Sequence, residues 1–224
     1  MRPNARDRTL NAANTLRRGP LHAVRWARLA GIGLSVAALV ACGPQPPAGV
    51  AQIDGDYAVV SRLRPHSLQR VRIEVAISFH CPACKRFQPS LDTLAAKYGE
   101  RLSIEQTAVT PRSGSGRPER LFLLAKRAGL GPVARDALYR ARFDLKQDIE
   151  QDAVLGGIAR QIGLPPELLA QLDSAALKRE QASIDARTRV FAAYTPSILV
   201  EDQLLVDSDA AQIARVINGL LPSR

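Results

Sequence analysis

Two cysteines, Cys81 and Cys84, lie two residues apart between an apolar run and an amphipathic segment, and this arrangement constrains the fold more than any other feature. The run 71–77 alternates apolar and polar residues at first and then becomes apolar, which predicts a buried strand. Apolar residues then recur at helical spacing and predict one buried helix face: Cys84, Phe87, Leu91, Leu94 and Tyr98. Gly99 is expected to end this helix, and Pro89 is expected to kink it.

A cysteine at the start of a helix is chemically reactive. Unpaired amide N–H groups and the positive end of the helix dipole stabilise the thiolate of Cys81. Cys84 comes one turn later, where it is shielded and can resolve mixed disulfides. A strand, a CxxC pair and a kinked helix together form a redox supersecondary unit.

The residues around the pair resemble a known family. Segment 79–89, Phe-His-Cys-Pro-Ala-Cys-Lys-Arg-Phe-Gln-Pro, is similar to the active-site segment of thioredoxin-fold proteins, including the proline five residues after the second cysteine. The Pro-x dipeptide resembles the DsbA branch, where Phe-x-Cys-Pro-x-Cys is usual. Residues 54–57 with 63–65 are similar to the DsbA entry strand, and Thr195-Pro196 before the apolar run 197–200 matches the cis-proline loop.

This resemblance implies an α/β architecture: a thioredoxin fold with an inserted helical domain, as in DsbA. It divides the chain into a first thioredoxin-fold part at 54–111, a helical insertion at 112–192 and a second part at 193–224. The resemblance covers roughly residues 54–221. The chain before the first strands is too short for the dimerisation domain of DsbC-type isomerases, so we expect a monomer.

The pattern of the chain gives the expected elements. The strands are expected at 57–63, 71–77, 102–109, 197–200 and 204–207. Residues 112–118 are expected to form a Gly/Ser/Pro-rich loop. The helices of the insertion are expected at 119–128, 132–146, 152–161, 166–171 and 175–191. Ser208 is expected to cap a last helix that buries Ile213, Val216, Ile217 and Leu220.

The resemblance also implies a chemistry. Cys81 and Cys84 would exchange disulfides with reduced, exported proteins, and a membrane-bound, quinone-linked partner of the DsbB type would reoxidise the pair. No cofactor is expected. Thr195 and Pro196, the latter in a cis peptide bond, would present backbone to an extended substrate.

Several residues are expected to tune the pair. Pro82 and Ala83 occupy the dipeptide where DsbA proteins commonly carry Pro-His, and Ala83 offers the thiolate neither charge nor donor, which predicts a weaker oxidant. His80 could stabilise the thiolate or point to solvent. Thr195 replaces the valine of many DsbA proteins and is shared with thioredoxins and isomerases. Glu74 could act as a buried proton acceptor, or simply be exposed.

The front of the chain reads as a targeting segment. A basic region carries seven arginines and precedes the uncharged 13-residue run 29–41, which is too short to span a bilayer as a stable helix. The run ends in Leu-Val-Ala-Cys, which resembles a bacterial lipobox. This predicts a lipoprotein signal peptide at 1–41, lipidation of Cys42 and a proline-rich linker at 42–53, on the periplasmic side of the inner or outer membrane. The alternative is an ordinary signal peptide.

Charge and ligand content argue against two other classes. The whole chain has a net charge of +10, but with seven arginines and one aspartate in residues 1–41 the remainder carries only +4. It shows no clustered basic stripe with aromatics, so nucleic-acid binding is not expected. Beyond residue 41 it has two histidines, His66 and His80, and no second CxxC, so a metal site is not expected either.

Two alternatives to a disulfide-introducing enzyme remain open. One is a thioredoxin-like disulfide reductase, for example in cytochrome c maturation. The other is a non-catalytic binding or chaperone lipoprotein, against which the intact cysteine pair speaks.

Overall fold

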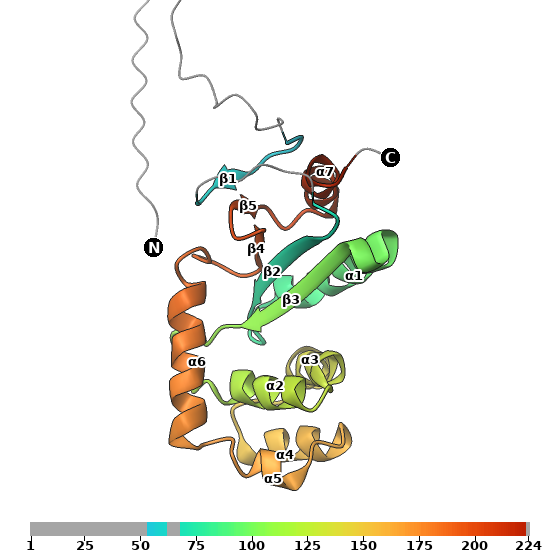
Figure 1. Cartoon of the computed structure of the whole chain (residues 1–224). Helices are drawn as coiled ribbons and strands as arrows, with labels where there is room; N and C mark the ends of the chain where they lie inside the picture. Colours follow the sequence, from blue (N-terminus) through green and yellow to red (C-terminus); the bar gives the residue numbers. More distant parts are fainter. Residues whose placement is uncertain (1–52, 62–67, 223–224) are drawn as a thin grey trace, which may run out of the picture. The chain divides into compact units, whose positions relative to one another are not determined.

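The computed structural model describes residues 53–61 and 68–222. The signal segment, Cys42, most of the linker and residues 63–65 of the expected entry strand lie outside these ranges. A five-stranded sheet has the order β1-β5-β4-β2-β3 (Figure 1). The strands are β1 (Ala58–Val59), β2 (Val71–Ile77), β3 (Leu102–Ala108), β4 (Ser197–Val200) and β5 (Leu204–Val206).

Strand β2 joins the two halves of the sheet. It pairs in parallel with β3, from Val71 opposite Leu102 to Ile77 opposite Ala108. On its other side it pairs antiparallel with β4, where Ile73 lies opposite Val200. The hairpin partner β5 continues the sheet and pairs antiparallel with β1. The strands expected at 71–77, 102–109, 197–200 and 204–207 are therefore confirmed to within one residue, whereas the strand expected at 57–63 is reduced to β1 among the described residues.

The described residues also form seven α-helices. They are α1 (Pro82–Tyr98), α2 (Arg117–Arg127), α3 (Gly131–Tyr139), α4 (Asp152–Gln161), α5 (Pro166–Leu169), α6 (Ala175–Thr188) and α7 (Ala210–Leu220). Of these, α2 to α6 lie together at one end of the sheet (Figure 1). A 3₁₀ turn, Gly99–Arg101, follows α1, and a π-helical turn, Arg140–Asp144, follows α3. Helices α2 to α6 lie between β3 and β4 in the chain, as expected for the insertion.

Helix α1 begins at the cysteine pair because local chemistry favours a start there. The Cys81 sulfur accepts a hydrogen bond from the Cys84 amide as the N-cap, and Pro82 occupies the first turn, where no amide donor is needed. The predicted apolar face is buried. Gly99 ends the helix with a positive φ of 53°, a conformation that glycine adopts at low cost. Helix α1 therefore holds both cysteines at the carboxyl end of β2.

Several helix boundaries in the insertion differ from expectation, and α5 and α6 end earlier than expected, at Leu169 and Thr188. Helix α2 begins at Arg117, inside the expected loop, because Pro118 in its first turn favours a helix start. The helix expected at 132–146 ends its α-helical part at Tyr139 and widens into the π-helical turn. Helix α4 has the expected bounds.

The cap of the last helix was predicted one residue too early. Asp209, rather than Ser208, is the N-cap of α7, and its side chain accepts the Gln212 amide hydrogen bond at 2.8 Å. Both residue types cap helices well, so composition alone does not separate them. The four apolar residues expected to face inward are buried.

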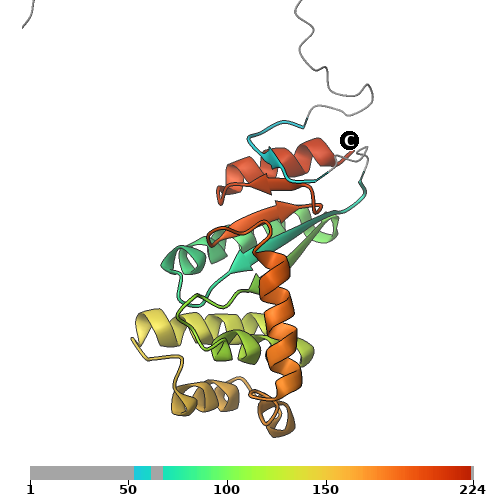
Figure 2. The ribbon, with the colours of Figure 1, turned by 90° about the vertical axis from the view of Figure 1, so that its left-hand side faces the viewer.

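Helix α6 carries the chain back from the insertion to the sheet (Figure 2). The Gln181 amide donates to the carbonyl of Ala108 at the end of β3, at 3.0 Å. Asp185 accepts a hydrogen bond from the Thr110 amide at 2.9 Å. These contacts fix the insertion to the end of β3 that lies nearest the cysteines.

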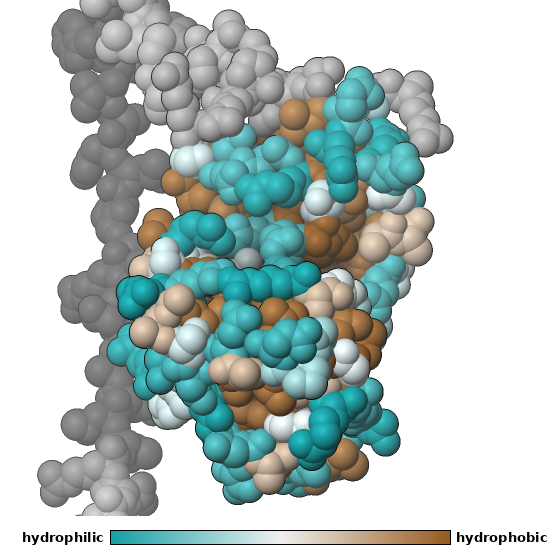
Figure 3. Space-filling model, turned by 60° about the horizontal axis from the view of Figure 1, so that its bottom comes forward, coloured by the Kyte–Doolittle hydropathy of each residue, from teal (hydrophilic) through white to brown (hydrophobic). Residues whose placement is uncertain are grey.

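The surface of the insertion is mixed in polarity. On the face that Figure 3 shows, apolar residues are interrupted by hydrophilic ones. Within residues 53–61 and 68–222, no helix is long and apolar enough to cross a membrane.

Candidate functional site

The two cysteine side chains differ strongly in exposure. Cys81 is partly exposed, whereas Cys84 is fully buried. The Cys81 sulfur accepts a hydrogen bond from the Cys84 amide at 3.3 Å and donates one to the Thr195 carbonyl at 3.1 Å. The site is therefore made by the start of α1 and the loop before β4, which are over 110 residues apart in the chain.

Hydrogen bonding separates the acidities of the two thiols. Burial raises the pKa of Cys81, but hydrogen bonds from the Thr195 hydroxyl and the Cys84 amide outweigh it and hold the pKa below its usual value. Burial raises the pKa of Cys84 to about 12. Because the thiolate is the nucleophile, Cys81 can attack or be attacked at the surface while Cys84 stays protonated.

The loop before β4 has the predicted geometry. The peptide bond between Thr195 and Pro196 is cis. Ser197 donates its hydroxyl hydrogen to the Tyr194 carbonyl at 2.6 Å and thus ties the loop to the start of β4. Thr195 thereby reaches Cys81 with both its carbonyl and its hydroxyl.

Pro82, which is exposed, and Ala83, which is half-buried, form the first turn of α1. The Ala83 amide lowers the pKa of Cys81, whereas its methyl side chain supplies no donor. The dipeptide therefore acts on Cys81 through its backbone.

His80 faces the insertion. Its Nε2 lies 3.4 Å from a carboxylate oxygen of Glu150, and both side chains are about one quarter exposed. Burial lowers the pKa of His80, while the Glu150 charge opposes this shift and the Arg142 charge adds to it. The imidazole is therefore mostly neutral at pH 7, and stabilisation of the Cys81 thiolate by His80 stays a prediction.

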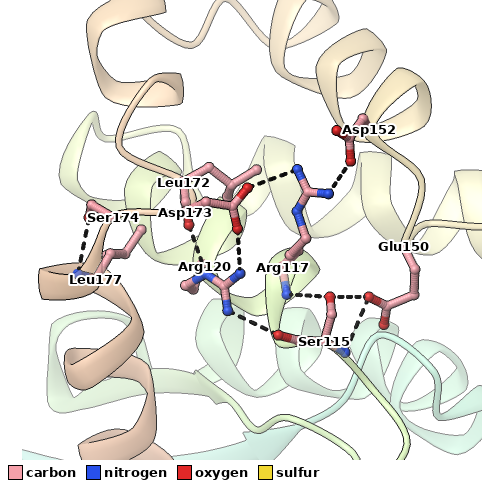
Figure 4. A network of polar contacts seen from close by, with 9 residues as sticks. All are labelled: Ser115, Arg117, Arg120, Glu150, Asp152, Leu172, Asp173, Ser174 and Leu177. Atoms are coloured by element: carbon pink, nitrogen blue, oxygen red, sulfur yellow. Dashed lines mark hydrogen bonds and ion pairs between the residues drawn. The ribbon is translucent and has the colours of Figure 1, made fainter.

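Glu150 belongs to a polar network inside the insertion (Figure 4). It accepts hydrogen bonds from the amide and the hydroxyl of Ser115. The Ser115 hydroxyl accepts a hydrogen bond from the Arg117 amide, and its carbonyl accepts one from the buried Arg120. Asp173, just before α6, pairs with Arg117 at 3.0 Å and with Arg120 at 2.9 Å. The network thus links the residue before Cys81 to the far part of the insertion.

Glu74 is buried, but on the wrong side of the sheet for the predicted role. Gln106 of β3 donates to Gln88 of α1, so α1 covers the face that carries Gln106 and its register partner Val75. Glu74 points to the opposite face, where it accepts a hydrogen bond from Thr107 at 2.8 Å and lies 3.6 Å from Arg187 of α6. The structure therefore does not bring Glu74 to the cysteines.

Sequence reasoning missed two residues that the fold brings to the site. Tyr139, at the end of α3, is buried and its pKa is raised by burial and by the charges of both cysteines. Glu150 contacts His80. Both come from the insertion, 55 or more residues from the motif, and neither carries a local signal: Tyr139 reads as a core position and Glu150 as a surface charge.

The described residues offer no evident place for a metal ion. Within residues 53–61 and 68–222, no group of three or more histidine, cysteine, aspartate or glutamate side chains is arranged to hold one. The cavities that flank β3, of about 240 and 380 Å³, are lined by residues other than the two cysteines.

Comparisons with known proteins find similarity in fold but none in sequence families. No protein-family model matches the chain, and no curated protein matches it in sequence. Solved structures do match. The crystal structure of Pseudomonas aeruginosa DsbA is 15% identical, covers 73% of this chain and 89% of its own, and has a TM-score of 0.59.

Two further structures agree with it. Reduced DsbA1 from Neisseria meningitidis is 18% identical over 78% of this chain and 96% of its own, with a TM-score of 0.58. The DsbA oxidoreductase from Xylella fastidiosa is 17% identical over 69% and 89%, with a TM-score of 0.57. The expected fold is thereby confirmed: a thioredoxin fold of the DsbA type, with its helical insertion.

Proposed function

We propose that this protein is a thiol:disulfide oxidoreductase that introduces disulfides into exported proteins. The observation that carries the proposal is the asymmetric pair: a partly exposed Cys81 of lowered pKa beside a buried Cys84 of raised pKa, at the start of a helix. The likeness in fold to solved DsbA structures supports it.

The reaction is an exchange of disulfides. A substrate thiolate attacks the Cys81 sulfur, the bond between Cys81 and Cys84 breaks, and Cys84 leaves with the electron pair. A second substrate thiolate then attacks the substrate sulfur of the mixed disulfide and expels the Cys81 thiolate. The substrate is oxidised by two electrons and the pair is reduced by two. The hydrogen bonds around Cys81 favour this direction because they stabilise the thiolate that is released.

The reduced pair must be reoxidised before the next cycle. We infer that a membrane-bound, quinone-linked partner of the DsbB type does this, on the basis of the DsbA-type fold and motif. The lipobox-like segment supports attachment to the periplasmic side of a bacterial membrane through Cys42.

The first test is the reduction potential of the pair. The full chain is equilibrated in glutathione buffers and its free thiols are alkylated. Peptide mass spectrometry then gives the fraction of Cys81 and Cys84 that is reduced. A potential above about −180 mV supports the oxidase. A potential near about −250 mV or lower would instead make the protein a reductase, which the neutral Ala83 beside the thiolate would favour.

Cysteine variants separate catalysis from binding. C81S should abolish exchange with a reduced substrate protein. In C84S the Cys81 thiolate should attack a disulfide of an oxidised substrate protein and expel one substrate thiolate, and the mixed disulfide should persist because Cys84 is not there to resolve it. If both variants support substrate oxidation as well as the wild type does, the protein is not an oxidoreductase and the binding or chaperone alternative gains.

Lipidation is tested on its own. Cells that express the wild-type chain should incorporate labelled palmitate into it, and C42S should abolish the label and release the protein from membranes. Equal labelling of C42S would overturn the anchor without affecting the assignment of Cys81 and Cys84.

A further inference from the structure

The departure of Cys84 creates an electrostatic problem inside the protein. Cys84 is fully buried, and burial raises the pKa of its thiol to about 12. When the disulfide opens, this sulfur leaves as a thiolate in surroundings that disfavour charge. A hydrogen-bond donor placed beside it would stabilise that charge as it develops.

Strand β2 supplies no such donor from its side chains. The face that α1 covers carries Ile73, Val75 and Ile77, all fully buried and apolar. The buried carboxylate of this strand, Glu74, points to the opposite face toward α6. A donor must therefore come from another element.

Helix α3 brings a phenol to this place. The Tyr139 side chain is buried, its ring packs against that of Phe79 at 5.3 Å, and Phe79 lies two residues before Cys81. On its other side the ring packs against Phe143 at 6.2 Å. The ring is thus held between the redox motif and the π-helical turn of the insertion.

The hydroxyl group of Tyr139 is unusual because it is buried without a hydrogen-bond partner among the described residues. An unsatisfied buried hydroxyl destabilises a folded protein. Besides burial, the charges of Cys84 and Cys81 raise the pKa of this phenol, so it keeps its proton at neutral pH and can donate it in a hydrogen bond.

We propose that Tyr139 donates a hydrogen bond to the Cys84 sulfur as it leaves the disulfide. The bond between Cys81 and Cys84 breaks, its electron pair goes to Cys84, and the phenol O–H stabilises the new thiolate without losing its proton. Cys84 then takes a proton from solvent and the phenol returns to its unpaired state. This inference rests on the proposed function and assigns the insertion a part in its chemistry.

The test compares rates with equilibria. Oxidised full-length wild type and Y139F are each mixed with reduced glutathione, and the reaction is quenched with acid at set times. Mass spectrometry then measures how much of the disulfide between Cys81 and Cys84 has been reduced. The second-order rate constant should fall about tenfold in Y139F, the effect of one hydrogen bond to a charged group. The equilibrium constant should stay within about twofold, because the hydroxyl lacks a partner in the dithiol state.

A second tyrosine on the same fold provides the matched control. The Tyr98 hydroxyl, at the other end of α1, bonds Asn218 at 2.9 Å and the Ala214 carbonyl at 3.1 Å. Y98F should lower the free energy of unfolding and leave the rate constant unchanged. Y139F should lower the rate constant and leave the free energy of unfolding unchanged or higher, because it removes an unsatisfied polar group.

The outcomes separate the two proposals. If wild type exchanges disulfides and Y139F matches its rate, the role of Tyr139 is wrong and the proposed function stands. If Y139F lowers both the free energy of unfolding and the equilibrium constant of the exchange, Tyr139 has a structural role only. If wild type does not exchange with glutathione at all, the proposed function itself fails.

Discussion

At the scale of single residues, the acidity of Cys81 depends on few donors. The Thr195 hydroxyl and the amides of Ala83 and Cys84 all lower its pKa against the effect of burial. Of these, the Thr195 hydroxyl can be removed without changing the backbone, because valine has the same shape as threonine.

T195V is therefore expected to raise the pKa of Cys81. Losing one hydrogen bond of about 1 kcal/mol should slow alkylation of Cys81 at pH 7 by about fivefold, and the pair should become a weaker oxidant. Alkylation rates against pH, read by peptide mass spectrometry at Cys81, measure the shift. T93V removes an exposed hydroxyl on α1 that bonds only the Pro89 carbonyl, and it should leave the profile unchanged.

At the scale of elements, the insertion and the redox motif meet at His80 and Glu150. Burial has the largest effect on the pKa of His80 and lowers it. Two further charges of the insertion also act on this pKa: Arg142 lowers it and Asp148 raises it. The protonation of the residue before Cys81 is thus set by elements that a minimal thioredoxin fold does not have.

E150Q is expected to lower the pKa of His80 further, because the Glu150 carboxylate is the charge that raises it most. An NMR titration of the His80 ring protons measures this directly. D152N is the control: Asp152 lies two residues away, is highly exposed and pairs with Arg117 instead. A His80 pKa that is equal in wild type and E150Q would show that the 3.4 Å contact carries no charge interaction.

The elements that the sequence predicts well are those with a strong local pattern. Three local patterns are each sufficient to predict an element: the buried run of β2, the helical spacing after Cys84 in α1 and the apolar stripe of α7. The start of α2, the π-helical turn and the Asp209 cap were missed because several starts or caps satisfy the same local rules. Glu74 was misplaced because alternation does not say which face of β2 the cysteines lie on.

At the scale of the whole molecule, one buried group opposes folding. Glu119 at the start of α2 is fully buried, and neither of its oxygens has a hydrogen-bond partner among the described residues. Burial raises its pKa to about 8, and the charges of Glu150 and Asp185 add to the shift.

E119Q is expected to stabilise the protein at high pH only. Because the folded pKa lies above the unfolded value of 4.5, the carboxyl costs nothing below pH 4.5, and its cost grows until about pH 8. Wild type and E119Q should unfold equally at pH 4 and differ by on the order of 3–5 kcal/mol at pH 8. Urea unfolding of the oxidised proteins measures the difference, with E180Q, a partly exposed carboxylate paired with Arg127, as the control.

The pairing of β2 with β4 sets an order of assembly. These strands are neighbours in the sheet, yet Ile73 and its partner Val200 are separated by the whole insertion. During synthesis the central strand therefore lacks one neighbour until the insertion has been made. Thr195 arrives with β4, so its contacts with Cys81 can form only then. The amides of α1 lie beside Cys81 in the chain, whereas the part of its acidity that comes from Thr195 is acquired last, when the two halves of the sheet close.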